Sequence, residues 1–281
     1  MTRGAPDLQA STSGAAPRPS AATRTGLAAI PLDATFDTLG PEDGPPIVLL
    51  HGTRLTRSMW QPQRPLADSY RLVLVDLPGH GSLARIPFSL PGASAHVGRV
   101  IRAATRGRAV VVGQSLGGYV AMDLAVTHPE QVRALVLCSC TQEPRTIART
   151  APGVVGSYLA RAAAQSRQRR PGRAAPRGIA AGPGSHDQPP TEGWLFRGGT
   201  RALFTSLGMT FIPRLRAFDG PTLIVNGAGD QLFRRGEASF LAAAKDGRLH
   251  VIDGAHHVAC EEAPDAWNAV IRDFVEGLDS R

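Results

Sequence analysis

The chain has few cysteines and no long apolar run. Its 281 residues include three cysteines, Cys138, Cys140 and Cys260, which form neither an even disulfide framework nor a metal-ligand spacing. We therefore expect free thiols in a reducing, cytoplasmic compartment. No stretch of about 20 consecutive apolar residues occurs, so the sequence predicts no membrane span.

The N-terminus lacks the apolar segment that a secretory signal peptide requires. Residues 1–26 are rich in Ala, Ser, Thr, Pro and Gly, a composition typical of a disordered tail. Because the segment also carries arginines and few acidic residues, an organellar presequence is the alternative interpretation.

Lysine is almost absent, and the positive charge is concentrated in one segment. The net charge is +8, and Lys245 is the only lysine among 31 basic residues, which indicates a coding bias toward arginine. Residues 141–190 hold eight arginines against two acidic residues, and 161–177 is the densest part. If this segment bound nucleic acid, its affinity would depend strongly on the salt concentration. We expect no specific nucleic-acid partner.

Short apolar runs alternate with segments of helical spacing along most of the chain. The expected strands are 27–32, 34–39, 47–50, 71–76, 109–112, 131–138, 222–225 and 248–252. The expected helices are 57–67, 93–105, 119–128, 235–244 and 264–278. This order predicts an α/β fold with a mostly parallel, doubly wound sheet flanked by helices.

Residues 141–213 interrupt this alternation. We expect a core formed by 27–140 and 214–281, with 141–213 inserted as a cap. Within the cap, 165–190 is rich in Pro, Gly and Arg and is predicted to be flexible. The aromatic residues that follow, among them Trp194 and Phe204, either form the interior of the cap or line a pocket.

The pentapeptide Gly113-Gln114-Ser115-Leu116-Gly117 lies between an apolar strand and an apolar helix. A Gly-x-Ser-x-Gly turn in that context is typical of a nucleophile elbow, which exposes the serine at a sharp bend. The flanking glycines allow strand and helix to approach closely. The alternative interpretation is a tight turn with an incidental serine.

A serine hydroxyl needs a base to accept its proton, and the base needs a partner that orients it. Asp230 follows the strand 222–225, while His256 and His257 follow the last strand. Ser115 also follows a strand, so all these side chains are expected at one edge of a parallel sheet. Asp253, just before the histidines, is interpreted as a turn residue.

These motifs resemble those of the α/β-hydrolase family over roughly residues 27–278. The resemblance is carried by His51-Gly52, Asp76-Leu-Pro-Gly-His-Gly81, Gly113–Gly118, Gly229-Asp230 and the block Gly254–Pro264. It implies a catalytic triad of Ser115, Asp230 and His257. His256 then occupies a position that is more often glycine in the family.

The resemblance also implies an oxyanion hole made by the backbone N–H groups of Thr53 and Leu116. Two such donors stabilise the tetrahedral intermediate of acyl transfer. Some relatives carry the acid after the preceding strand, but Cys138–Thr141 contains no aspartate. His51 is interpreted as a histidine that braces its loop.

The predicted function is that of a serine hydrolase acting on a small carbonyl substrate, a carboxylic ester or a similar compound. Alternatives are a hydrolase of carbon–carbon bonds, a peroxidase-like relative with the same triad, and a non-catalytic receptor or scaffold. We expect no cofactor and no metal, and a monomer or homodimer. The substrate itself is not encoded in these motifs.

Overall fold

The computed structural model describes residues 26–27, 29–150 and 209–279. The expected disordered tail lies almost entirely outside the described residues. The same holds for the segment 165–190, which the sequence predicts to be flexible, for the aromatic residues Trp194 and Phe204, and for most of the expected cap.

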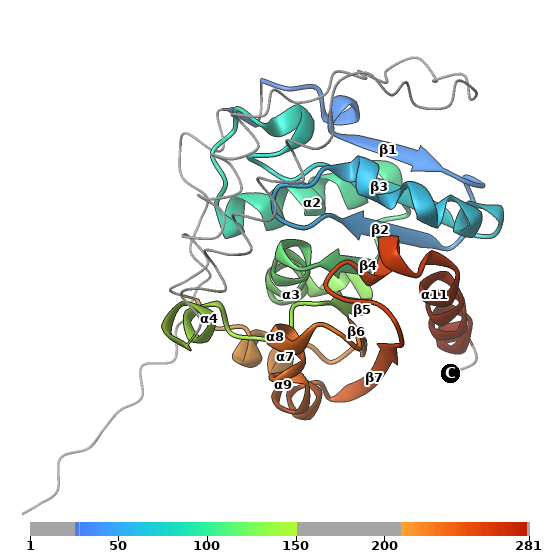
Figure 1. Cartoon of the computed structure of the whole chain (residues 1–281). Coiled ribbons are helices and arrows are strands. Elements are labelled where there is room, and N and C mark those ends of the chain that lie inside the picture. Colours follow the sequence, from blue (N-terminus) through green and yellow to red (C-terminus); the bar gives the residue numbers. More distant parts are fainter. Residues whose placement is uncertain (1–25, 28, 151–208, 280–281) are drawn as a thin grey trace, which may run out of the picture.

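A single sheet of seven strands forms the centre of the described structure, in the order β1-β3-β2-β4-β5-β6-β7 (Figure 1). Its first edge strand β1 runs antiparallel to β3, and the other pairs are parallel. The strands are β1 (Phe36–Leu39), β2 (Pro46–Leu50), β3 (Arg71–Val75), β4 (Ala109–Gln114), β5 (Val132–Cys138), β6 (Pro221–Gly227) and β7 (Asp246–Ile252). The expected fold class is confirmed.

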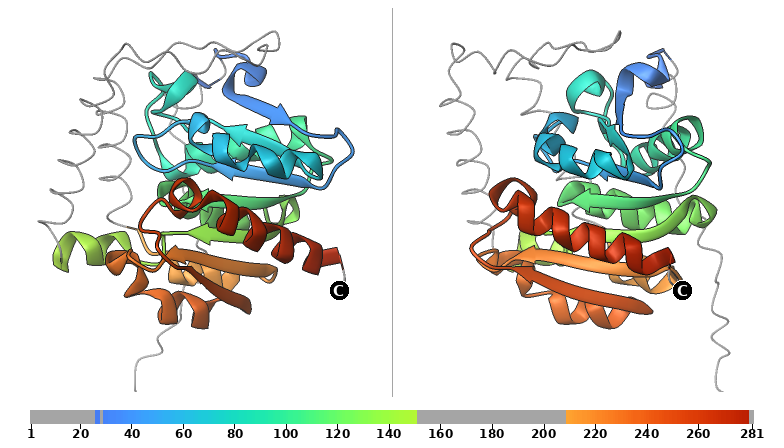
Figure 2. Two further views of the ribbon diagram at one scale, coloured as in Figure 1. Left: turned by 45° about the vertical axis from the view of Figure 1, so that its right-hand side comes forward. Right: turned by 90° about the vertical axis from the view of Figure 1, so that its right-hand side faces the viewer.

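Helices cover both faces of the sheet (Figure 2). One apolar core contains residues of α2 (Leu90–Ala104), α3 (Leu116–Thr127), α7 (Ile212–Ala217) and α9 (Glu237–Ala243). The core on the opposite face contains residues of η2 (Arg57–Asp68), α10 (Ala259–Glu262) and α11 (Pro264–Asp279). Shorter elements are η1 (Leu32–Thr35), η3 (Gly81–Leu83), η4 (Pro129–Gln131), α4 (Pro144–Thr150) and α8 (Gln231–Arg234). No helix in this part of the chain is long and apolar enough to cross a membrane.

The strand β4 shows why the sheet forms from this sequence. All six of its residues are buried, as expected for a strand covered on both faces. Because side chains alternate along a strand, Val111 packs into one core while Val110 and Val112 pack into the other. Each fully buried valine contributes about 1.5–3 kcal/mol relative to exposure.

One sequence expectation near the N-terminus is wrong, and another is confirmed with a difference in helix type. Residues 27–32 form no strand in their described part, since 29–31 are irregular and η1 begins at Leu32. The segment expected as a helix at 57–67 is the 3-10 helix η2, which contains Pro62 and Pro65. Proline has no backbone N–H to donate and blocks regular helical hydrogen bonding, which explains the tighter form.

The three cysteines are free, as expected from their number and spacing, and all three are buried. Burial raises the pKa of Cys138 to about 12, and it raises the pKa of Cys140 and Cys260 well above the ordinary value of a thiol. All three groups therefore stay protonated near neutral pH and act as small apolar side chains.

Candidate active site

Ser115 lies at the sharp bend between β4 and α3. Its backbone has φ 51° and ψ −109°, a conformation that side-chain-bearing residues rarely adopt. Its N–H donates a hydrogen bond to the carbonyl of Cys138 at 2.8 Å, which ties the bend to β5. A strained residue held in this way by its surroundings is typical of a functional position.

The two glycines that flank this bend are required by close backbone contacts. A Cβ atom added at Gly113 would lie 2.3 Å from the carbonyl carbon of Gly117. One added at Gly117 would lie 2.2 Å from the carbonyl oxygen of Leu50, at the end of β2. Larger residues would push α3 away from the sheet and move the serine with it.

Ser115, His257 and Asp230 come together at the carboxyl edge of the sheet. Nε2 of His257 lies 3.3 Å from Oγ of Ser115, and Nδ1 lies 2.8 Å from Oδ2 of Asp230. An ionised carboxylate can only accept, so the proton of the neutral imidazole resides on Nδ1. The unprotonated Nε2 then faces the serine hydroxyl and can accept its proton.

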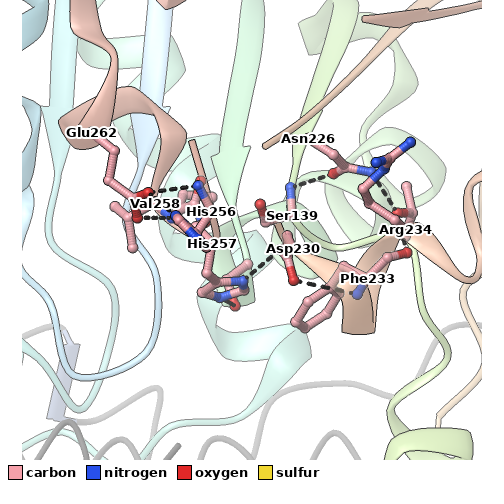
Figure 3. Close-up of polar contacts among 12 residues, drawn as sticks. Ser139, Asn226, Asp230, Phe233, Arg234, His256, His257, Val258 and Glu262 are labelled. Carbon is pink, nitrogen blue, oxygen red and sulfur yellow. Dashed lines mark hydrogen bonds and ion pairs between the residues drawn. The ribbon is translucent and has the colours of Figure 1, made fainter. Parts of the chain in front are cut away.

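Asp230 is fixed by the helix that it begins, and a buried polar network joins the neighbouring loops (Figure 3). Its Oδ1 accepts a hydrogen bond from the N–H of Phe233 at 3.4 Å, at the start of α8. Asn226, at the end of β6, accepts from the N–H of Ser139 at 3.0 Å and donates to Glu237 at 2.9 Å. The loops after β5 and β6 are thereby held together.

The two adjacent histidines have different environments. The side chain of His256 is 71% exposed, and its Nδ1 lies 3.3 Å from a carboxylate oxygen of Glu262. Glu262 also accepts hydrogen bonds from the N–H groups of His256 and Val258, at 2.6 and 3.1 Å, on either side of His257 (Figure 3). The geometry therefore places His257, rather than His256, beside the serine.

Thr53 and Leu116 lie at the ends of two neighbouring strands. Leu50 of β2 pairs with Gly113 of β4, so the loop after β2 and the first turn of α3 are adjacent. Leu116 is the first residue of α3, where N–H groups have no partner within the helix. Thr53 is 8% exposed. This placement is compatible with two backbone donors directed at one oxygen.

His51 braces the loop that leads to Thr53. Its Nδ1 donates to the carbonyl of Gly52 at 2.8 Å, and its Nε2 accepts from the N–H of Leu77 at 3.0 Å. Burial lowers the pKa of His51, so the ring is neutral and supplies one donor and one acceptor, as this pair of contacts requires. Its interpretation as a loop-bracing histidine agrees with these contacts.

Asp76 accepts the hydrogen bonds that close the neighbouring loop after β3. Its carboxylate receives the N–H groups of Arg57 and Ser82, both at 2.9 Å, and pairs with the guanidinium of Arg57. His80 packs edge-on against His51, and burial lowers its pKa to about 3. These groups stabilise the loop structure rather than face the serine.

The sequence indicated no role for two residues near the site. Gln114 donates from Nε2 to the carbonyl of His257 at 2.6 Å, across 143 residues of sequence. Tyr119 donates from its hydroxyl to the carbonyl of Gln142 at 2.5 Å, and burial raises its pKa well above the ordinary value. Neither contact leaves a signal in local spacing.

Metal ligands do not gather in the described part of the chain. Over residues 26–27, 29–150 and 209–279, no group of three or more His, Cys, Asp or Glu could hold a metal ion. The polar groups at the carboxyl edge of the sheet are instead paired with one another, in the chain Ser115–His257–Asp230.

A mostly parallel seven-stranded sheet with a serine, a histidine and an aspartate at its carboxyl edge defines an enzyme-like α/β architecture. The model of the Alpha/beta hydrolase family matches residues 47–270 of this chain. The chain therefore belongs to the alpha/beta hydrolase family.

Curated relatives narrow the comparison. The chain is 31% identical over 246 residues to the pimeloyl-[acyl-carrier protein] methyl ester esterase of Edwardsiella ictaluri. This match covers 82% of this chain and 93% of the relative. It is 36% identical over 122 residues to the protein of that name from Aeromonas hydrophila, and this match covers 42% of this chain. In that match and in several others, the chain spans only 40–46% of the relative.

Among solved structures, a thermophilic esterase from Thermogutta terrifontis is similar to this chain. The TM-score is 0.63 at 21% sequence identity, and the match covers 86% of this chain and 93% of the esterase. At this level of identity, the similarity concerns the fold alone.

Proposed function

We propose that this protein is a carboxylic ester hydrolase that acts through an acyl-enzyme on Ser115. The observation that carries the proposal is the hydrogen-bonded chain from Ser115 through His257 to Asp230, with distances of 3.3 and 2.8 Å. A nucleophile, a base and a group that orients the base are the three parts needed for acyl transfer.

In the first half of the reaction, Oγ of Ser115 attacks the ester carbonyl while Nε2 of His257 accepts its proton. Asp230 stabilises the resulting imidazolium and keeps it oriented. The backbone N–H groups of Thr53 and Leu116 stabilise the negative oxygen of the tetrahedral intermediate. His257 then donates the proton to the departing alcohol, and the acyl group remains on the serine.

The second half uses water as the nucleophile. His257 accepts a proton from the water, which attacks the acyl-enzyme at the same carbonyl carbon. Collapse of the second tetrahedral intermediate returns the proton to Ser115 and releases the carboxylic acid. The sum is one ester and one water converted to one acid and one alcohol.

The names of the relatives suggest the substrate class. Several are pimeloyl-[acyl-carrier protein] methyl ester esterases, and one of them aligns over 93% of its length. We therefore propose methyl esters of acyl chains as substrates, with the carrier-bound pimeloyl methyl ester as the first compound to test. Free dimethyl pimelate serves as the carrier-free comparison.

We also propose that residues 141–213 form an insertion between β5 and β6. The carboxylate of Glu143 accepts hydrogen bonds from the N–H groups of Phe211 and Ile212, each at 2.9 Å, so the two ends of this segment meet. They meet near α3, since the ring centroids of Tyr119 and Phe211 are 4.5 Å apart. The insertion therefore begins and ends close to the serine.

A fluorophosphonate probe, which labels activated serines, tests the proposal directly. Wild type is expected to be labelled and to hydrolyse short acyl esters, whereas Ser115→Ala should do neither. Ser139→Ala is the matched control, because Ser139 also follows a strand and has a positive φ of 49°. The control should retain labelling.

The outcomes separate the remaining interpretations. Wild type that neither reacts with the probe nor cleaves any ester would contradict the hydrolase proposal and favour a non-catalytic role. Labelling that persists in Ser115→Ala would contradict the assignment of the nucleophile. A diketone in the substrate panel tests hydrolysis of a carbon–carbon bond by the same triad.

A further inference from the structure

Gln114 joins the serine bend to the histidine loop. It is the last residue of β4, directly before Ser115, and it is 1% exposed. Its Nε2 lies 2.6 Å from the backbone carbonyl oxygen of His257. A carbonyl oxygen only accepts, so the NH₂ group of the amide must face it. One short hydrogen bond thus connects the residue before the nucleophile to the residue that carries the imidazole.

The strand places this side chain where it can make the contact. Side chains alternate along β4, so Gln114 lies on the same face as Val110 and Val112, which pack against the α10 and α11 side of the sheet. Its Cγ also lies near Gly52, since a Cβ atom added there would be 3.6 Å away. The side chain therefore contacts the loops after β2 and β7.

Other hydrogen bonds fix the histidine loop to different parts of the structure. Glu262, in α10, accepts the N–H groups that flank His257. The carbonyl of Ala255 accepts the N–H of Gly229 at 2.8 Å, which joins the loop to the segment before Asp230. These bonds position the imidazole relative to Asp230, while the bond from Gln114 positions it relative to Ser115.

We propose that Gln114 is a positioning residue that sets the distance between Nε2 of His257 and Oγ of Ser115, an inference that rests on the proposed function. That distance is 3.3 Å, beyond the usual range for a hydrogen bond to a hydroxyl, so further separation would interrupt proton transfer. A misplacement of about 1 Å at a reacting group can lower the rate on the order of 100-fold.

Gln63 offers a matched control. It is fully buried, and its Nε2 donates to the backbone carbonyl of Cys260 at 2.7 Å. Like Gln114, it has no partner for its Oε1 among the described residues. Replacing either residue by methionine keeps the length of the side chain and removes one buried hydrogen bond. The difference is that Cys260 lies in α10, beyond the histidine loop.

The experiment compares Gln114→Met and Gln63→Met in the full-length chain. The readouts are kcat and KM for an acyl ester, the rate of fluorophosphonate labelling, and the melting temperature. Both variants should lower the melting temperature to a similar extent. Gln114→Met should also lower kcat and the labelling rate by about 10- to 100-fold, with KM changed by less than about two-fold. Gln63→Met should keep kcat within about two-fold.

An equal loss of kcat in both variants, or wild-type kcat in Gln114→Met, would overturn the positioning role while leaving the hydrolase proposal intact. Failure of the hydrolase proposal appears instead in wild type, as absence of both labelling and hydrolysis. Should Gln114→Met not fold, Gln114→Asn takes its place, because its amide is one methylene too short to reach the carbonyl. The same loss of kcat is expected there.

Discussion

Oδ2 of Asp230 lies 2.8 Å from Nδ1 of His257, although the two residues are 27 positions apart and follow different strands. The contact is buried on the aspartate side, where the side chain is 6% exposed, and the histidine side chain is 20% exposed. The imidazole can therefore exchange protons at one nitrogen while the other stays bonded to a fixed carboxylate.

We predict that Asp230→Asn lowers kcat/KM for esters by about 10³- to 10⁴-fold. The amide can donate to Nδ1, which favours the tautomer with its proton on Nε2 and removes the base that faces Ser115. Asp253→Asn is the control, because Asp253 is exposed on the turn before the histidine loop. Similar losses in the two variants would contradict the role of Asp230.

Replacing each of the two adjacent histidines separately gives a second prediction. His257→Gln should reduce ester hydrolysis and fluorophosphonate labelling to near the level of Ser115→Ala, because no other base lies within 3.3 Å of Oγ among the contacts of the described residues. His256→Gln should retain most of the activity, since its side chain is 71% exposed and pairs with Glu262. Steady-state rates of the two purified variants decide between them.

The glycine before the bend gives a prediction for stability. Gly113→Ala should prevent folding or lower the free energy of unfolding by several kcal/mol, on the order of the largest single-residue effects, because its Cβ would lie 2.3 Å from backbone. Gly107→Ala meets no atom within 4 Å, but the glycine has φ +88°. It should cost about 1–2 kcal/mol through backbone strain alone. Denaturant unfolding of both variants measures the difference.

Buried histidines predict that stability falls in mild acid. Burial lowers the pKa of His96 to about 4 and that of His80 to about 3, whereas the unfolded chain titrates near 6.5. Between pH 6.5 and about 4, the unfolded state binds more protons at these positions. Stability therefore increases with pH across this window and is lost as pH falls.

The variant His96→Leu tests this pH dependence. Between pH 7 and pH 5, protonation of His96 in the unfolded chain lowers the free energy of unfolding by about 2 kcal/mol. The variant should therefore lose less stability than wild type over this range. His250→Leu changes an exposed histidine and is the control for removing an imidazole at the surface. Denaturant titrations at several pH values give the slopes, and parallel curves for wild type and His96→Leu would contradict the prediction.

The sequence predicted the sheet well because its five inner strands are almost fully buried. Runs such as Ile47–Leu50 and Ala109–Val112 are continuously apolar and have few other interpretations. The run at 27–32 was misinterpreted, since its apolar residues Leu27 and Ile30 pack in a small cluster with Leu83 instead of joining the sheet. Apolar content alone does not distinguish these two outcomes.

For the site, order along the chain and position after strands predicted that Ser115, Asp230 and one of the two adjacent histidines lie together. In the sequence, only the family resemblance distinguished His256 from His257. In the structure, their exposure and their contacts distinguish them. The bond from Gln114 to His257 could not be predicted, because it connects residues 143 positions apart and depends on the exact register of two loops.

The carboxylate of Glu143 accepts hydrogen bonds from the N–H groups of Phe211 and Ile212, so the two ends of the connection between these residues are joined at one point. The cost of closing a connection grows only slowly with its length. Evolution can therefore lengthen, shorten or replace the stretch between residues 143 and 211 without moving a strand of the sheet. A change in the length of this stretch is therefore expected to leave Ser115, His257 and Asp230 in the same relative positions.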